Sequence, residues 1–283
     1  MYLSNVISFS FRETLAAIRQ QPLYRHPSAF LWQRCLSVRN QFCEAVVAAG
    51  YLSWEQMVNA ACRYCVGASK LSGVIFWQID QEGRIHDGKV MYYLPDCHRD
   101  KSKGAHPTWI SSLLAHRHTF YQDGTTSHCF FGLHLLTSDI RHQTSVICIV
   151  EAEKSAFILS ELYPDVVWLA SGGLGEVQPD KFRPLRGYKV ILFPDTDSQG
   201  IAFRRWSEAA GLVMQSSFWE GSPPIRVSPL LELHATEDQK RRKIDLVDYY
   251  FESRSSLRKA TLYTFRLENA TLLPSGGRKR RNL

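Results

Sequence analysis

The sequence predicts a mixed α/β protein whose C-terminal half is a parallel sheet flanked by helices. Short apolar segments recur after residue 144, at residues 145–150, 166–170 and 189–193. Segments with helical spacing of apolar residues lie between and after them, at residues 153–162 and 201–210. A glycine-rich turn at residues 171–175 and a polar loop at residues 194–200 separate these elements. Short apolar strands that alternate with helices are typical of a parallel sheet covered on both faces.

The N-terminal half has a different pattern. Residues 10–20 and 29–49 carry apolar residues at three- and four-residue intervals, which predicts helices. Ser53 suits the N-cap of a further helix that runs from Trp54 towards Cys62. Residues 73–80 and 85–94 predict two strands joined by a turn at residues 81–84. A polar, basic segment at residues 97–107 predicts an exposed loop, and residues 109–114 predict a short helix.

These patterns divide the chain into four regions. We expect an N-terminal helical region at residues 1–70 and a small basic α+β subdomain at residues 71–144. The α/β domain follows at residues 145–252, and residues 253–283 form a tail with a basic end.

The composition is that of an ordinary globular protein. Of 283 residues, 45% are hydrophobic and 22% are charged. The apolar runs are much shorter than the roughly 20 residues of a membrane span, and residues 1–11 lack the features of a signal peptide. We therefore expect a cytoplasmic protein with no membrane partner, whose seven cysteines are reduced thiols. The net charge of +7 suits an anionic partner.

Acidic side chains follow two of the predicted strands. Glu151 comes directly after the strand at residues 145–150, and Asp195 and Asp197 come just after the strand at residues 189–193. Ligands bind at the carboxyl ends of parallel strands, so the three carboxylates converge if these strands are neighbours. Such a cluster suits Mg²⁺ or Mn²⁺, which could stabilise the attacking and leaving oxygens of a phosphoryl or nucleotidyl transfer. Alternatively, the two aspartates make an Asx turn and cap the helix at Ile201.

Four motifs resemble the Toprim domain of primases from phages and mobile elements. Residues 149–156 resemble the Toprim signature, a strand that ends in Glu and precedes a helix, and residues 169–173 resemble its second-strand turn. Residues 193–200 resemble its D-x-D-x-x-G motif. Residues 243–248 resemble its closing K-D-x-x-D element with one extra residue after the lysine. Residues 145–252 would thus be a Toprim-like domain.

The resemblance extends upstream. Primase cores place a small basic subdomain before the Toprim domain, and residues 74–93, 101–104 and 131–134 resemble its strand pair, lysine-bearing loop and glycine-containing element. From about residue 60, the chain also resembles an uncharacterised group of Toprim-containing proteins from Bacteroides-type mobile elements.

The resemblance implies a function. It is primase-like, Mg²⁺-dependent nucleotidyl transfer from nucleotides on single-stranded DNA, in the replication of a mobile element, with a replicative helicase as a conceivable partner. Asp195 and Asp197 would ligate the metal, and Glu151 would complete the site or act as acid or base. Lys101 and Lys103 would contact the nucleic acid.

The chain also departs from the Toprim pattern. Ala152 replaces the usual glycine, and Ser155 stands where many relatives carry aspartate. Lys154 could reach a phosphate of the nucleic acid, or it could be an exposed helix lysine. Asp245 and Asp248 could extend the acidic site, or Asp245 could cap the last helix.

Two other functions stay open. One is a catalytically inactive nucleic-acid-binding module, which the departures favour, together with the lack of a recognisable zinc ribbon. Cys62 and Cys65 form a lone C-x-x-C without a partner pair. The other is nuclease-type Toprim cleavage of phosphodiesters. The upstream subdomain favours a primase over a nuclease.

Overall fold

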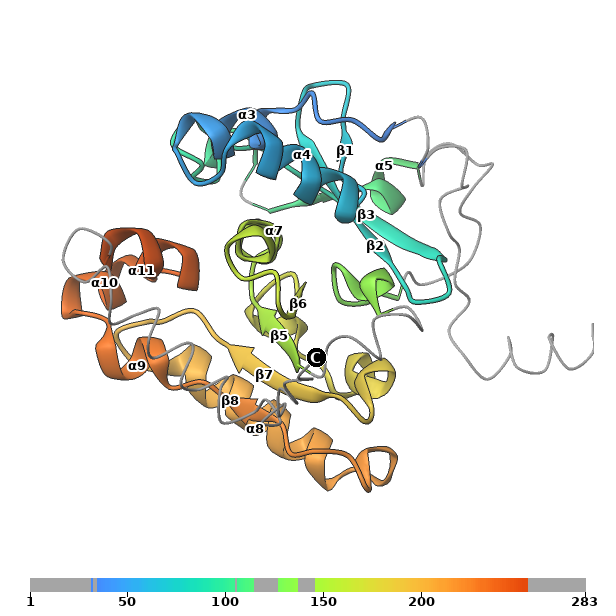
Figure 1. The fold of residues 1–283 in the computed structure, drawn as a ribbon, viewed down its shortest axis with the longest axis vertical. Coiled ribbons are helices and arrows are strands. Elements are labelled where there is room, and N and C mark those ends of the chain that lie inside the picture. The colour runs from blue at the N-terminus through green and yellow to red at the C-terminus, as the bar shows by residue number, and fades with distance from the viewer. Residues whose placement is uncertain (1–31, 33–34, 105, 115–126, 137–145, 254–283) are drawn as a thin grey trace, which may run out of the picture. The chain divides into compact units, whose positions relative to one another are not determined.

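The computed structural model describes Trp32 and residues 35–104, 106–114, 127–136 and 146–253 (Figure 1). The chain splits into two compact units, Met1–Leu135 and Leu136–Leu283. Each unit has its own sheet. The helix predicted at residues 10–20 and the tail beyond residue 253 lie outside the described residues, and the four predicted regions stay a prediction.

The first unit contains a four-stranded antiparallel sheet with the strand order β1-β2-β3-β4. Its strands are β1 Gly67–Ala68, β2 Val74–Ile79, β3 Ile85–Met91 and β4 Thr108–Trp109. The predicted pair of strands is confirmed as the β2–β3 hairpin. Asp80 holds the turn, because its Oδ1 accepts hydrogen bonds from the backbone N–H groups of Glu82 and Arg84 at 3.1 and 2.8 Å.

Strand β2 is buried on both faces, which explains its nearly continuous apolar sequence. On one face, Phe76 makes edge contacts with Phe42 at 5.2 Å and with Phe131 at 5.4 Å between ring centroids. On the other face, Ile75 and Trp77 belong to a cluster that also contains Ile79, Ile85, Val90 and Ile110. The short helix α5 (Ile110–Leu114) supplies the last of these residues.

In the described residues from Gln41 to Arg63, two helices precede this sheet. Helix α4 (Trp54–Arg63) begins as predicted, with a capping box formed by Ser53 and Gln56. The helix predicted over residues 29–49 is wrong for residues 37–40, since α3 spans only Gln41–Ala48. The reason is local: the Asn40 side chain accepts a hydrogen bond from the Cys43 N–H at 2.9 Å, and this starts a new helix.

The second unit contains a parallel sheet flanked by helices, which confirms the predicted fold class. Its strand order is β6-β5-β7-β8, with β5 Val146–Val150, β6 Val167–Ala170, β7 Lys189–Phe193 and β8 Arg226–Val227. All residues of β5 and β6 are buried. Helix α7 (Glu153–Leu162) connects β5 to β6, and helix α8 (Ile201–Gln215) connects β7 to β8, on the other face of the sheet (Figure 1).

Helix α8 is five residues longer than predicted. Gly211 does not end it, because the apolar spacing continues through Ala202, Trp206, Ala210 and Val213, all of which are buried. A Cβ atom at Gly211 would meet nothing within 4 Å. The helix therefore ends where its buried face ends.

Up to residue 253, where the described part of the chain ends, three short helices follow β8: α9 (Leu230–His234), α10 (Glu237–Arg242) and α11 (Leu246–Ser253). Helix α11 packs against α7. Helix α10 begins with a capping box formed by Thr236 and Gln239 and has no buried residue. Asp245, directly before α11, lies against the first turn of α7, with its Oδ2 3.0 Å from the Nζ of Lys154.

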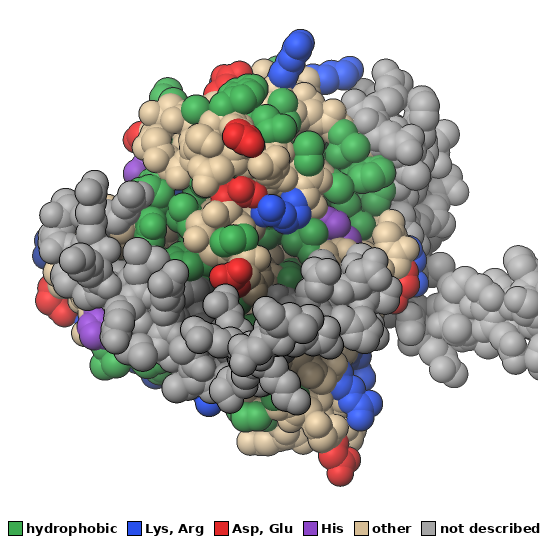
Figure 2. Space-filling model, in the orientation of Figure 1, with side chains coloured by type: hydrophobic (Ala, Val, Ile, Leu, Met, Phe, Trp, Pro, Cys, Tyr) green, Lys and Arg blue, Asp and Glu red, His purple; other side chains and the backbone are tan. Residues whose placement is uncertain are grey.

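Charged side chains are dispersed over the visible surface. On the face drawn in Figure 2, basic and acidic groups alternate among the other described side chains and form no continuous basic patch. None of the described helices has the length and apolar character needed to cross a membrane.

Candidate functional site

Two acidic side chains meet at one edge of the parallel sheet. Strands β5 and β7 are neighbours, with Val150 paired to Phe193, so the chain leaves both strands at the same edge. Glu151 directly follows Val150, and Asp195 lies two residues after Phe193. The condition for convergence is therefore met, because the two strands are neighbours, and their ends bring Glu151 and Asp195 together.

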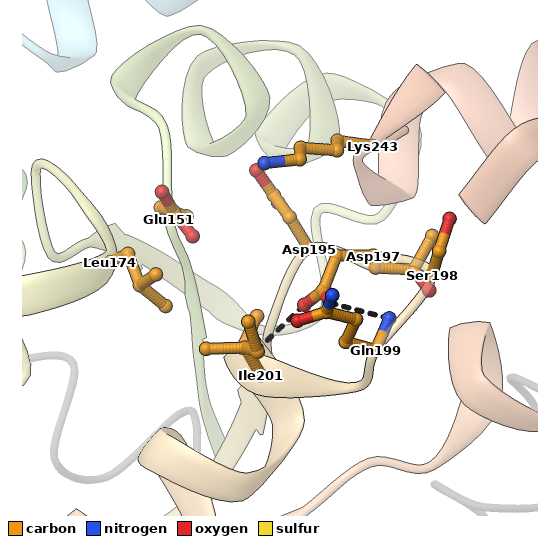
Figure 3. Close-up of a pocket in the computed structure, with 10 residues that line it drawn as sticks. Glu151, Leu174, Asp195, Asp197, Ser198, Gln199, Ile201 and Lys243 are labelled. Carbon is orange, nitrogen blue, oxygen red and sulfur yellow. Dashed lines mark hydrogen bonds between the residues drawn. The ribbon is translucent and has the colours of Figure 1, made fainter. Parts of the chain in front are cut away.

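Both side chains line one pocket of about 380 Å³ (Figure 3). Its walls come from four separate segments: the end of β5, the turn after β6, the segment from the end of β7 into the first turn of α8, and the residue after α10. The lining residues are Glu151, Leu174, Asp195, Thr196, Asp197, Ser198, Gln199, Ile201, Ala202 and Lys243. The volume lies in the range of small-molecule binding sites.

Asp195 lies in a strongly negative environment. Burial raises the pKa of its carboxyl group well above the ordinary value, and the nearby Glu151, Asp245 and Asp248 raise it further. Lys154 acts in the opposite direction and lowers it. Because these carboxylates repel one another, a cation in the pocket would stabilise the ionised form of Asp195.

Asp197 organises the loop that carries Asp195. Its Oδ1 accepts a hydrogen bond from the Gln199 N–H and its Oδ2 accepts one from the Ala202 N–H, both at 2.9 Å. Burial raises the pKa of Asp197, but these backbone N–H groups and Lys243 outweigh that effect and lower it. The predicted Asx turn and helix cap are thus present for Asp197, and its role as a metal ligand stays a prediction.

Lys154 is not an exposed helix lysine. It is buried in the first turn of α7, with 8% of the residue exposed. Its Nζ lies 3.0 Å from Asp245 Oδ2 and 3.5 Å from Asp248 Oδ1. A contact between Lys154 and a nucleic-acid phosphate stays a prediction, and the ammonium group already has two carboxylate partners.

Asp245 caps α11, which is one of the two roles that the sequence left open; the extension of the acidic site stays a prediction. Its Oδ1 accepts a hydrogen bond from the Asp248 N–H at 2.8 Å, which caps α11. Its Oδ2 accepts a hydrogen bond from the Ser155 hydroxyl at 2.7 Å. Burial raises the pKa of Asp245, but Lys154 and these hydrogen bonds outweigh burial and lower it. Asp245 therefore stays ionised.

Lys243 is a pocket residue that the sequence did not identify as a site residue. It follows α10 in a left-handed conformation, with φ of 57° and ψ of 55°. Non-glycine residues rarely adopt this conformation, and it is common at functional sites. In the sequence, Lys243 is the lysine that begins the K-D-x-x-D-like motif, and it is also the last residue of the basic run at residues 240–243.

An ion pair fixes the end of α10 against α11. Arg242 donates two parallel hydrogen bonds to Glu252, both at 2.7 Å. Glu252 raises the pKa of Arg242, and Arg242 lowers the pKa of Glu252. This bidentate pair holds Arg242, the residue directly before Lys243, against Glu252 of α11.

The donor set fits a hard divalent cation with few protein ligands. In the described part of the chain, no three His, Cys, Asp or Glu side chains are arranged to hold a metal ion. Mg²⁺, however, is commonly bound by one or two carboxylates and completes its shell with water and substrate phosphate. Glu151 and Asp195 supply two such carboxylates beside an open pocket.

The loop lysines belong to the first unit. Lys101 and Lys103 are exposed in a single 3₁₀ turn, Lys101–Lys103, which Asp100 caps through the Ser102 N–H at 3.0 Å. This agrees with the predicted exposed loop. Their contact with nucleic acid stays a prediction.

The fold and the site define a class of protein: an α/β protein with an acidic pocket at the carboxyl edge of a parallel sheet. The chain belongs to a family described as a domain of unknown function (DUF6371), whose model matches residues 40–196. The match includes Glu151, Lys154 and Asp195 but ends before Lys243 and Asp245. A comparison with curated proteins gives no match.

Solved structures with a similar chain course include two primases. One is the primase fragment of the bacteriophage T7 primase-helicase protein, at 18% identity and a TM-score of 0.39, over 70% of this chain and 71% of that one. The other is the Aquifex aeolicus primase (zinc-binding and RNA polymerase domains), at 16% identity and a TM-score of 0.35, over 69% of this chain and 45% of that one.

Proposed function

We propose that this protein is a primase-like nucleotidyltransferase that joins nucleotides on single-stranded DNA with Mg²⁺ or Mn²⁺ at Glu151 and Asp195. The observation that carries the proposal is the convergence of these two carboxylates, from neighbouring strand ends, on a pocket that Lys243 also lines. The order of the four Toprim-like motifs supports it as well. Replication of a mobile element and a helicase partner belong to the proposal through that resemblance alone.

In this proposal, some residues of the site bind the metal ion and others bind phosphate groups. Glu151 and Asp195 would hold the cation, which would neutralise charge on the phosphate oxygens of the incoming nucleotide. Asp197 keeps the loop after β7 in place and can add a further oxygen. Lys243 draws the negatively charged nucleotide into the pocket, and Lys101 and Lys103 bind the backbone of the template. Glu151 is also the candidate acid or base.

A specific observation favours a second candidate, the catalytically inactive binding module. Lys154 pairs with Asp245 and Asp248, so part of the negative charge of the cluster is already compensated within the protein. In that case the pocket would bind nucleotide or nucleic-acid phosphate without turnover. Toprim-type cleavage of phosphodiesters would use the same carboxylates, and the products of the assay below distinguish it from synthesis.

The test is template-dependent synthesis of dinucleotides from labelled nucleotides in Mg²⁺ or Mn²⁺. We expect synthesis by the wild type and a loss of at least 100-fold in Asp195→Asn and Glu151→Gln, because each removes one anionic metal ligand. Glu208→Gln is the matched control, since Glu208 is an exposed carboxylate on α8 of the same unit.

Three results would contradict the proposal. Shortened template in place of new dinucleotide would indicate cleavage. Binding of labelled nucleotide without turnover would indicate the inactive module. Synthesis that survives in both site variants would exclude Glu151 and Asp195 as the metal ligands.

A further inference from the structure

The acidic side chains around the pocket form two groups. Glu151, Asp195 and Asp197 line the pocket itself. Asp245 and Asp248 lie behind it and converge on the Lys154 ammonium group, at 3.0 and 3.5 Å. The two groups interact electrostatically, because Asp245 and Asp248 raise the pKa of Asp195 and Lys154 lowers it.

The Lys154 ammonium group lies between the carboxylates of Asp245 and Asp248, in the position that a cation bound to both would take. Its side chain is 11% exposed, and those of Asp245 and Asp248 are 8% and 19% exposed. Ionised groups that are this poorly hydrated must be compensated by an opposite charge nearby. One positive charge held between two carboxylates is also the arrangement around a bound metal ion.

Ser155 belongs to the same arrangement. Its residue is fully buried, and its hydroxyl donates to the Asp245 oxygen that also faces Lys154 Nζ. The other oxygen of Asp245 accepts the Asp248 N–H. Both oxygens of Asp245 are therefore engaged by donors of the protein.

We propose that Lys154 is a built-in cation that takes the place of a second divalent ion, so that the site binds one divalent ion and not two. The single ion is the one held by Glu151 and Asp195, and in this respect the inference rests on the proposed function. Lys154 is a positioning residue: it holds Asp245 and Asp248 in place and adds a fixed positive charge beside the pocket. Two-ion sites, by contrast, hold their ions roughly 3.5–4 Å apart between shared carboxylates.

The experiment counts bound Mn²⁺ per chain by electron paramagnetic resonance, on the full chain without nucleotide. We expect one Mn²⁺ in the wild type and two in Lys154→Met, which keeps the length of the side chain but removes its charge. Lys154→Met should lose roughly 5–15 °C in Tm without metal, because two buried carboxylates are left uncompensated. Mn²⁺ should restore most of that loss.

Two further variants keep the test decisive. Lys154→Met/Asp245→Asn removes one positive and one negative charge of the same ion pair. It should therefore fold well and bind one Mn²⁺ even if Lys154→Met folds poorly. Lys181→Met is the matched control, because Lys181 is also a poorly exposed lysine and pairs with Glu176 at 2.6 Å. It should lose stability and still bind one Mn²⁺.

The outcomes separate this inference from the proposed function. Two ions in the wild type, or one ion in folded Lys154→Met, would overturn the inference and leave the metal site intact. No ion in the wild type but one in Lys154→Met would uphold Lys154 as the substitute cation and refute the proposed catalytic metal site. No ion in either protein would overturn both.

Discussion

The Ser155 hydroxyl donates a hydrogen bond of 2.7 Å to Asp245, a residue 90 positions later in the chain. This contact joins the first turn of α7 to the segment before α11. It also gives a physical reason for the serine in the Toprim-like motif. An aspartate here would place a second carboxylate against Asp245, whereas the serine supplies a donor.

Ser155→Ala tests this contact. We expect a loss of about 1.5–3 kcal/mol in the free energy of unfolding, the range for a hydrogen bond to a charged group, measured by urea denaturation. Ser160→Ala is the matched control in the same helix. Ser160 is also buried, but its hydroxyl donates to the backbone oxygen of Phe157, so its removal should cost about 1 kcal/mol or less. Equal costs would mean that the link to Asp245 contributes nothing.

Asp195→Asn should stabilise the metal-free protein. The amide keeps the shape of the side chain and removes a charge that burial and Glu151 disfavour. We expect Tm without metal to rise by about 2–4 °C for each kcal/mol of relieved repulsion, and the stabilisation by Mg²⁺ to disappear. Differential scanning calorimetry with and without Mg²⁺ measures both, and a lower Tm without metal would contradict the electrostatic argument.

The same substitution has a defined pH dependence. The pKa of Asp195 is raised on folding, so its contribution to stability is fully present below its ordinary pKa of about 3.9 and is lost as the pH rises through the folded value. The advantage of Asp195→Asn over the wild type should therefore be largest at alkaline pH and vanish near about pH 4. Urea denaturation of both proteins across this range measures the difference. An advantage that grows towards acid pH would give the opposite sign and refute the assignment.

Lys243 should show opposed effects on stability and binding. Lys243→Gly relieves the left-handed backbone and should raise the free energy of unfolding by about 1 kcal/mol. It also removes the ammonium group, so nucleotide affinity measured by calorimetry should fall about tenfold, or about 1.4 kcal/mol. Lys243→Met separates the two effects: it should lose the same affinity without any gain in stability. Unchanged affinity in both variants would exclude Lys243 from the site.

The Arg242–Glu252 pair should affect binding more than stability. Arg242→Lys keeps the charge but loses the two parallel hydrogen bonds. Because the pair is partly exposed, its loss should change stability little, while nucleotide affinity should drop several-fold through displacement of Lys243. Glu252→Gln should lower nucleotide affinity by a similar factor. The double variant Arg242→Lys/Glu252→Gln should bind nucleotide no more weakly than either single variant. Additive losses in the double variant would show that the residues act separately.

The elements near the carboxyl edge of the sheet were predictable because their signals are local. Apolar runs of five and four residues marked β5 and β7, and helical spacing marked α7, whose bounds agree with the prediction. The position of Glu151 and Asp195 then required only that these two strands be neighbours.

The rest of the site depends on contacts between distant segments. Lys154 has the sequence context of a surface lysine, and its burial follows only from the packing of α11 on α7. Lys243 reaches the pocket through a backbone conformation that no local pattern signals. Likewise, whether Asp197 binds a metal or caps a helix depends on loop geometry, and both options use the same residue types.

The position of β5 in its sheet has a consequence for how the site fluctuates. This strand is hydrogen-bonded on both sides and all its residues are buried. Its amide protons should therefore exchange with solvent only when the whole unit unfolds. Helix α10, which has no buried residue, should open and close far more often. Glu151 thus stands on the slowest-exchanging part of the unit and Lys243 on one of the fastest, so the pocket can admit and release a ligand while its acidic wall stays in place.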